Sequence, residues 1–301
     1  MSMEEFESLM EEISNWGRWG EDDELGTLNL ITPEKRRAAA GLVTEGISVS
    51  LSLTLDREKS DHNPYPFEHQ LSMEQFGTQT GAVDYYGISY HSTAHSHIDG
   101  LAHVLHRGRL YNGFTADVLK PDGAEKLGIH HMKDGIISRG VLVDMAWLKG
   151  VDYLEPGTAI TIADLEEWEA RTGITVGSGD VLLLRTGRWE LHRQRGQISM
   201  MTEGLAGFHA SVAKWLRQRD VAAIGSDGGS DVIPSGVEEL VVPLHALALV
   251  GLGMPMLDNL DLDAASRQAR DFDNRWTFLF VAAPLRVEGG TGSPLNPLAV
   301  F

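Results

Sequence analysis

Short apolar runs that alternate with amphipathic segments limit the fold of this chain more than any other feature. Continuous apolar runs bounded by turn residues are typical of buried strands, and strict apolar/polar alternation is typical of half-buried ones. The predicted strands are residues 46–55, 85–89, 138–147, 180–186, 221–224 and 278–283. Helical spacing of apolar residues predicts helices at residues 6–13 and 204–219. Thr161 as an N-cap indicates a helix at residues 162–172, and an apolar run indicates one at residues 244–251. This mixture predicts an α/β fold in which strands outnumber long helices.

The organisation along the chain favours one domain. A length of 301 residues would by itself allow about two domains. However, the composition is even, and we find no repeat and no Pro/Gly/Ser-rich linker. We therefore expect a single domain over residues 1–301, in which residues 1–30 form an N-terminal helical and loop arm. The acidic N-terminus lacks the features of a signal peptide, and no apolar stretch is long enough to span a membrane, so we expect a cytoplasmic location.

The charge balance and the absence of cysteine exclude several classes of function. The formal net charge is −18, whereas nucleic acids and anionic membranes are bound by basic surfaces, so we expect neither as a partner. A chain without cysteine has no disulfide, no thiolate nucleophile and no Cys-type zinc site. Any metal must therefore be held by histidine, carboxylate or other oxygen ligands.

Five of the 12 histidines lie between positions 91 and 106, and their spacing suits a strand. His91, His95, His97 and Asp99 have the same parity, so an extended chain would direct them to one face. Imidazole and carboxylate are common ligands of Zn²⁺ and Mn²⁺, and the set predicts a metal site. His103 would lie beyond a bend at Gly100, where it could carry a proton. The alternative is a group of unrelated core and surface histidines.

A metal site on one strand needs ligands from elsewhere in the chain. His245 is a polar residue that enters an apolar run, and its burial would require a partner. Asp258 follows the next turn and could return to the same place. It could instead cap a helix that the sequence indicates at residues 262–270. We predict both residues as further metal ligands.

The chain resembles the metal-dependent cyclase family, which includes bacterial kynurenine formamidases and isatin hydrolases. That family carries a Thr-His-x-Asp-x-x-x-His motif, which appears here over residues 96–103 with serine in place of threonine. Other segments that resemble the longer members are residues 19–30, 111–113, 139–142 and 289–294. The matching segments follow the same order along the chain as in the family, over about residues 16–301.

The resemblance implies a barrel-like, swivelling β/β/α core of mixed strands flanked by helices. It also implies one or two divalent ions per subunit, Zn²⁺ or Mn²⁺, and a homo-oligomer, either a dimer or a tetramer. By motif, His97 and Asp99 are ligands and His103 is the catalytic acid/base, with His245 and Asp258 in the places of later ligands. Short members have a histidine at the position that Thr93 occupies here. Either His91 or His95 would substitute for it.

These features predict a metal-dependent amidohydrolase similar to kynurenine formamidase and isatin hydrolase. A bound ion would activate water and polarise the amide, lactam or lactone carbonyl of a small substrate, while His103 protonates the leaving atom. Aromatic residues in candidate loops would suit an aromatic substrate, and Trp19, His69 and Tyr86 are the predicted substrate-binding residues. Two alternatives remain: a degenerate member that binds metal or ligand without catalysis, and a ring-closing cyclase.

Overall fold

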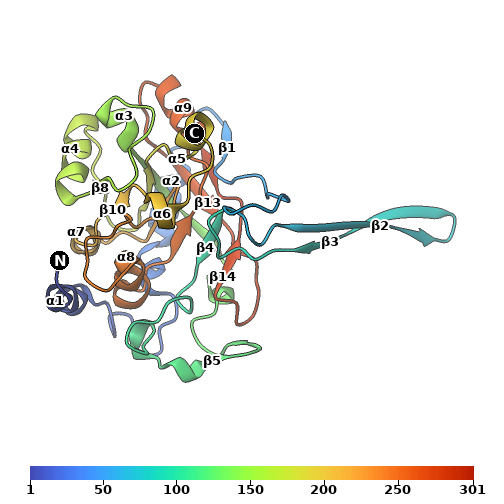
Figure 1. Ribbon diagram of the computed structural model, residues 1–301, viewed down its shortest axis with the longest axis horizontal. Helices are drawn as coiled ribbons and strands as arrows, with labels where there is room; N and C mark the ends of the chain where they lie inside the picture. Colours follow the sequence, from blue (N-terminus) through green and yellow to red (C-terminus); the bar gives the residue numbers. More distant parts are fainter.

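A curled, nine-stranded sheet forms the centre of the molecule and confirms the predicted α/β fold with a barrel-like core (Figure 1). The computed structural model describes residues 1–301, apart from the side chain at position 201. The order of strands in the sheet is β1-β15-β13-β7-β9-β11-β12-β4-β14. The strands from β7 to β12 are parallel, and those on either side of them pair antiparallel.

The sheet is assembled from short strands, and two-stranded ribbons lie outside it. The strands of the sheet are β1 (Ser48–Ser50), β4 (His97–Asp99), β7 (Ile136–Asp144), β9 (Val181–Arg185), β11 (Ala223–Ser226), β12 (Met256–Asp258), β13 (Thr277–Ala282), β14 (Gly292–Pro294) and β15 (Leu298–Val300). The other strands are β2 (Glu68–Phe76), β3 (Gln79–Gly87), β5 (Leu119–Lys120), β6 (Gly123–Ala124), β8 (Ala159–Ile160) and β10 (Gly207–Phe208).

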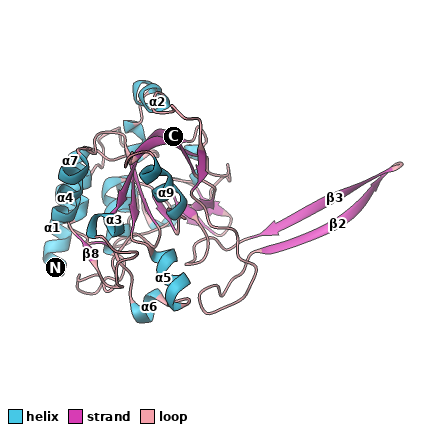
Figure 2. Cartoon of the chain, turned by 90° about the horizontal axis from the view of Figure 1, so that it is seen from above, coloured by secondary structure: helices cyan, strands magenta, loops and turns pink.

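Helices cover the sheet, and α1, α4 and α7 lie together along one side of the molecule (Figure 2). The α-helices are α1 (Met3–Ile13), α2 (Pro33–Ala40), α3 (Met145–Lys149), α4 (Ile162–Thr172), α5 (Arg188–Arg195), α6 (Met200–Glu203), α7 (Val212–Arg219), α8 (Pro243–His245) and α9 (Asp263–Asp271). A π-helical segment, η5 (Ala246–Leu252), continues α8. Short 3-10 turns are η1 (Gly26–Leu30), η2 (Tyr111–Gly113), η3 (Ala116–Val118) and η4 (Ile129–Met132). No helix in the described part of the chain is long and apolar enough to cross a membrane.

The parallel strands are covered by other parts of the chain on both faces of the sheet. Side chains on both faces are therefore buried, which explains why the sequence of these strands is continuously apolar. The four residues Val181–Leu184 of β9 are fully buried, as expected for a strand that is covered on both sides. Helix α4 has the predicted bounds because Thr161 and Asp164 form a capping box at its start. Gly173 ends this helix in the left-handed conformation.

Other predicted elements differ in extent from the observed ones. The strand expected at 46–55 is reduced to β1, and the helix expected at 204–219 begins only at Val212. The earlier residues of that helix pair with β8 instead, through β10. The strand expected at 85–89 is the end of β3, which pairs with β2 in a long hairpin that projects from the body of the molecule (Figure 1).

Candidate metal centre

The short strand β4 places two of the predicted ligands side by side near the edge of the sheet. His97 and Asp99 alternate with Ile98, which points into the apolar core. On one side, Asp258 of β12 lies directly opposite His97. On the other side, β14 pairs with β4, and Gly292 lies opposite Asp99. A side chain at position 292 would collide with the carbonyl oxygen of Ile98, so glycine is required for this approach.

The carboxylate of Asp99 lies at the centre of four imidazoles. Its Oδ1 is 2.8 Å from Nδ1 of His91 and 3.4 Å from Nε2 of His97. Its Oδ2 is 3.6 Å from Nε2 of His245 and 3.8 Å from Nε2 of His103. Asp99 is buried, and Oδ1 accepts no hydrogen bond of good geometry. An unsatisfied carboxylate oxygen surrounded by imidazole nitrogens is the donor chemistry of a divalent cation site.

The donors form two groups that share Asp99. One group is His91, Asp99 and His103, and the other is His97, Asp99 and Asp258; within each, one ligand atom per residue lies within 4.8 Å of the others. The tautomer of His97 is fixed, because its Nδ1 donates to the carbonyl oxygen of His95 at 2.8 Å and leaves Nε2 for an ion. The residues present therefore fit a divalent ion.

The structure places the two candidates for the ligand missing at Thr93 in different surroundings. The strand predicted through positions 91–99 is shorter than expected, because the chain bends over residues 91–95 and extends only from His97. The bend turns His91 towards Asp99, and Thr291 holds its Nε2 at 3.0 Å. His95 is buried outside both groups, and neither of its ring nitrogens has a hydrogen-bond partner.

His245 lies at the end of α8, where a buried carboxylate orients its ring. Asp231 accepts the Nδ1 hydrogen of His245 at 2.6 Å and also accepts from the backbone N–H of Leu244 at 2.7 Å. Nε2 of His245 consequently faces Asp258, 3.3 Å away, and Asp99. Sequence reasoning missed Asp231, although a buried carboxylate behind an imidazole is a common support of metal ligands.

Replacing Asp231 with asparagine tests this support. The side-chain amide would place a donor where the carboxylate accepts from His245, so the ring would lose its fixed orientation. We expect metal affinity to fall by about 10–100-fold, as measured by titration of the metal-free protein with Zn²⁺ or Mn²⁺. Ser235→Ala, on the same loop but directed at the Leu240 carbonyl, is the matched control and should leave affinity unchanged.

The protonation of the cluster follows from burial and from the neighbouring carboxylates. Burial lowers the pKa of His97 and of His245, but hydrogen bonds and charges from the nearby carboxylates outweigh it and raise both pKa values. Burial raises the pKa of Asp99, but contacts with the imidazoles outweigh it and hold this pKa well below its usual range. Burial lowers the pKa of His103 to about 4 against the opposing charge of Asp99, so its ring is neutral at neutral pH.

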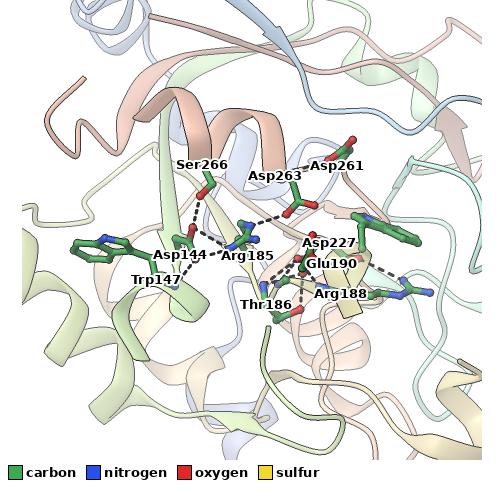
Figure 3. A network of polar contacts seen from close by, with 12 residues as sticks. Asp144, Trp147, Arg185, Thr186, Arg188, Glu190, Asp227, Asp261, Asp263 and Ser266 are labelled. Carbon is green, nitrogen blue, oxygen red and sulfur yellow. Dashed lines mark hydrogen bonds and ion pairs between the residues drawn. The ribbon is translucent and has the colours of Figure 1, made fainter. Parts of the chain in front are cut away.

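A buried arginine connects the two chain segments that carry the ligands. The Arg188 guanidinium donates to Oδ1 of Asn259 at 2.5 Å and to the carbonyl oxygen of Thr93 at 3.1 Å. Burial lowers its pKa to about 10, and it remains charged. Figure 3 shows Arg188 next to Asp227, whose carboxylate accepts from Thr186 and from the backbone at the start of α5. A second network, around Asp144, Arg185 and Asp263, lies beside it. Sequence reasoning gave no signal for Arg188.

The cluster lies in a cleft of about 240 Å³. Ser92, Thr93 and Asn259 contribute polar groups to its lining, and Met200 and Val242 contribute apolar ones.

The three predicted substrate-binding residues lie elsewhere in this chain. Trp19 packs against the Arg18 guanidinium, while His69 and Tyr86 are cross-strand neighbours on the β2–β3 hairpin, where His69 contacts Asp84. None of the three lines the cleft that contains Asp99.

Comparisons with known proteins agree with this fold. A family model described as "Putative cyclase" matches residues 49–230. An isatin hydrolase of Roseibium aggregatum is 27% identical over 154 residues, which are 48% of this chain and 54% of that protein, so the match spans about half of the relative. A crystal structure titled a novel cyclase is 30% identical with a TM-score of 0.85, covering 97% of this chain and 99% of that one.

A more distant structure shares the fold alone. Isatin hydrolase A from Labrenzia aggregata, solved with benzyl benzoate, is 21% identical with a TM-score of 0.58, covering 87% of this chain and 94% of that one. The family model, by contrast, covers more than half of the chain and includes the β4 segment with His97, Asp99 and His103. The chain therefore belongs to the cyclase family.

Proposed function

We propose that this chain is a metal-dependent hydrolase that opens the amide, lactam or lactone bond of a small substrate. The observation that carries the proposal is the shared position of Asp99 between two groups of imidazole and carboxylate donors in a cleft. The isatin hydrolase relative supports the reaction class. His91, His97, Asp99, His245 and Asp258 would hold one or two ions, either Zn²⁺ or Mn²⁺.

A divalent ion, when bound, would supply polarisation of the substrate carbonyl and a lowered pKa for water. The protein would supply the proton transfers. His103 stacks on His91 with ring centroids 3.8 Å apart, and its side chain is more accessible than that of Asp99. A neutral imidazole at this position can accept the proton of the attacking water and return it to the leaving nitrogen or oxygen. The C–N or C–O bond then breaks, and a carboxylate product remains.

The cleft favours a small substrate with an apolar part. Met200 and Val242 would contact that part and exclude water, while Ser92 and Asn259 offer polar groups to its carbonyl or leaving group. Asn259 is held by Arg188 and also donates to the carbonyl oxygen of Ser92 at 2.7 Å, so its position is fixed. The mixed apolar and polar lining of the cleft suits N-acyl anilines and fused lactams. An enzyme that prefers these substrates would be an amidohydrolase.

The proposal is tested by the loss and recovery of turnover. Chelator-treated protein should hydrolyse none of a panel of formamides, lactams and lactones, and should regain turnover when Zn²⁺ or Mn²⁺ is added. His103→Gln should lower turnover by about 10²–10⁴-fold, the usual contribution of an acid/base group. Its metal content should stay at half of the wild-type value or more.

A matched control separates this effect from a general loss of structure. His209→Gln changes a histidine that contacts Ser211 outside the cluster, and it should leave turnover unchanged. Metal-loaded protein that converts no member of the panel would instead support a binding function without catalysis. Turnover only in the direction of ring closure would support the cyclase alternative.

A further inference from the structure

A second cleft, of about 150 Å³, lies at the carboxyl ends of the neighbouring parallel strands β7 and β9. Asp144 and Arg185 are the last residues of these strands, they pair in register, and both line the cleft. Ligands of α/β sheets bind in crevices outside the carboxyl ends of parallel strands. Among the described residues, none lines both this cleft and the one that contains the metal cluster. The second cleft is therefore a separate place for a ligand, and its use does not depend on the proposed hydrolysis.

Arginines converge on this cleft, although the chain as a whole has a net charge of −18. They come from β9, α5 and α9 and are Arg185, Arg193, Arg267 and Arg270. Arg267 and Arg270 are exposed, and neither forms an ion pair with a carboxylate in the described part of the chain. They follow Asp263 on α9 by four and seven positions, which places all three on one face of the helix. Both arginines are therefore available to a ligand in the cleft.

Arg185 is the most buried of these arginines and keeps one nitrogen without a partner. Its Nε donates to Oδ1 of Asp263 at 2.8 Å, and its Nη1 donates to Oδ1 of Asp144 at 3.0 Å (Figure 3). Its Nη2 donates to none of the described residues, although the side chain is only 11% exposed. A charged donor that is largely withdrawn from water favours an oxygen atom of an anion as its acceptor.

The acidic residues of the lining do not compete strongly for these free donors. Each already accepts at least one hydrogen bond from a side chain of the protein; they are Asp144, Asp152, Glu190 and Asp263. Asp144 and Asp263 are held by Arg185, and Asp263 is held by Arg193 as well. A molecule in the cleft would therefore meet guanidinium donors whose own acceptors are missing.

We propose that this cleft binds a small dianion, either inorganic phosphate or a short dicarboxylate, among Arg185, Arg267 and Arg270. Guanidinium groups bind phosphate and carboxylate oxygens through paired, charge-assisted hydrogen bonds. A volume of about 150 Å³ corresponds to about five water molecules of about 30 Å³ each, which is enough for such an anion. The nearly closed set of charged walls, with Trp147 and Val151 as the other lining residues, favours a compact polar ligand.

Helix α5 connects this cleft with the metal cluster. Glu190 and Arg193 of the helix line the cleft, while Arg188 at its start donates to Asn259, the residue after Asp258. An anion held between α5 and α9 would fix the helix that supports the metal centre. The cleft would in this way link the presence of a small anionic metabolite to the order of the site.

The test is isothermal titration calorimetry of the full chain with inorganic phosphate and, separately, with succinate, at constant ionic strength. Wild-type protein should bind at least one of them with a dissociation constant below about 1 mM. The anion that binds more tightly identifies the class of ligand. Arg267→Gln/Arg270→Gln should weaken this binding by about 10-fold or more, because it removes two charged donors.

A control of equal charge accompanies the double variant. Arg171→Gln/Arg286→Gln changes two exposed arginines outside the cleft and should bind the anion as the wild type does. His97→Ala should also retain anion binding, which separates this site from the metal cluster and from the proposed hydrolysis.

A further variant guards against a loss of structure in α9. Val151→Glu adds a negative charge at an exposed residue of the lining, and it should weaken anion binding to the same extent with the far-ultraviolet circular dichroism of the wild type retained. Wild-type dissociation constants above about 1 mM for both anions would overturn the proposal. Equal affinity of the wild type and Arg267→Gln/Arg270→Gln would overturn it too, since the anion would then bind elsewhere.

Discussion

Replacing His97 with alanine is expected to abolish both metal binding and turnover. His97 is buried between Asp99 and Asp258, and its free Nε2 faces both carboxylates. The substitution removes a ligand. It also leaves the negative charges of Asp99 and Asp258 close together without the imidazole that lies between them. Removing a residue that only orients a metal ligand already lowers metal affinity by about 10–100-fold. Removing the ligand itself should therefore lower metal affinity by more than about 100-fold. Metal analysis after dialysis and turnover on the best substrate of the panel measure the two effects.

His91→Ala and His95→Ala provide a matched pair for the same experiment. His91 contacts Asp99, whereas His95 is buried outside the cluster. We therefore expect His91→Ala to lower metal affinity and His95→Ala to leave metal content unchanged, although it can lower stability. The reverse result would show that His95 is the ligand that replaces the one missing at Thr93. If His97→Ala kept both its metal and its turnover, the assignment of the cluster around Asp99 as the metal centre would be wrong.

The sequence was most informative where the chain is extended. His97 and Asp99 could be placed on one face because β4 is a strand, and side chains two residues apart on a strand point the same way. The same argument failed for His95, since the bend over residues 91–95 breaks the alternation. A bend among Ser, Thr and His residues has no strong signal in a single sequence, so the different surroundings of His91 and His95 could not be predicted.

The supporting residues of the site could not be predicted. Arg188 begins helix α5, which the sequence pattern did not predict, and only the fold brings it to Asn259, 71 positions away. Asp231 is 14 positions from His245 and joins it through a loop of no regular pattern. The hairpin was missed for another reason: apolar residues occur on both of its faces, so the period-two signal of a half-buried strand is weak.

The buried carboxylate of Asp227 accepts several hydrogen bonds at the start of helix α5, next to the site. It accepts hydrogen bonds from the backbone N–H groups of Thr186, Gly187 and Arg188, and from the Thr186 hydroxyl at 2.7 Å. These donors start helix α5, where a negative charge is favourable. Asp227 also compensates the charge of the buried Arg188 guanidinium.

Asp227→Ala is therefore expected to lower the free energy of unfolding by about 3–5 kcal/mol, because it leaves buried donors and a buried charge without a partner. The midpoint of thermal unfolding should fall by about 10 °C. Urea denaturation of the metal-free protein measures the change, and Asp152→Ala, an exposed residue near the same helix, should alter it by less than about 0.5 kcal/mol. Since Arg188 holds Asn259 beside Asp258, the variant should also bind metal more weakly than the wild type at a temperature where both are folded. A variant as stable as the Asp152 control would show that water replaces the carboxylate and that this network does not hold the site together.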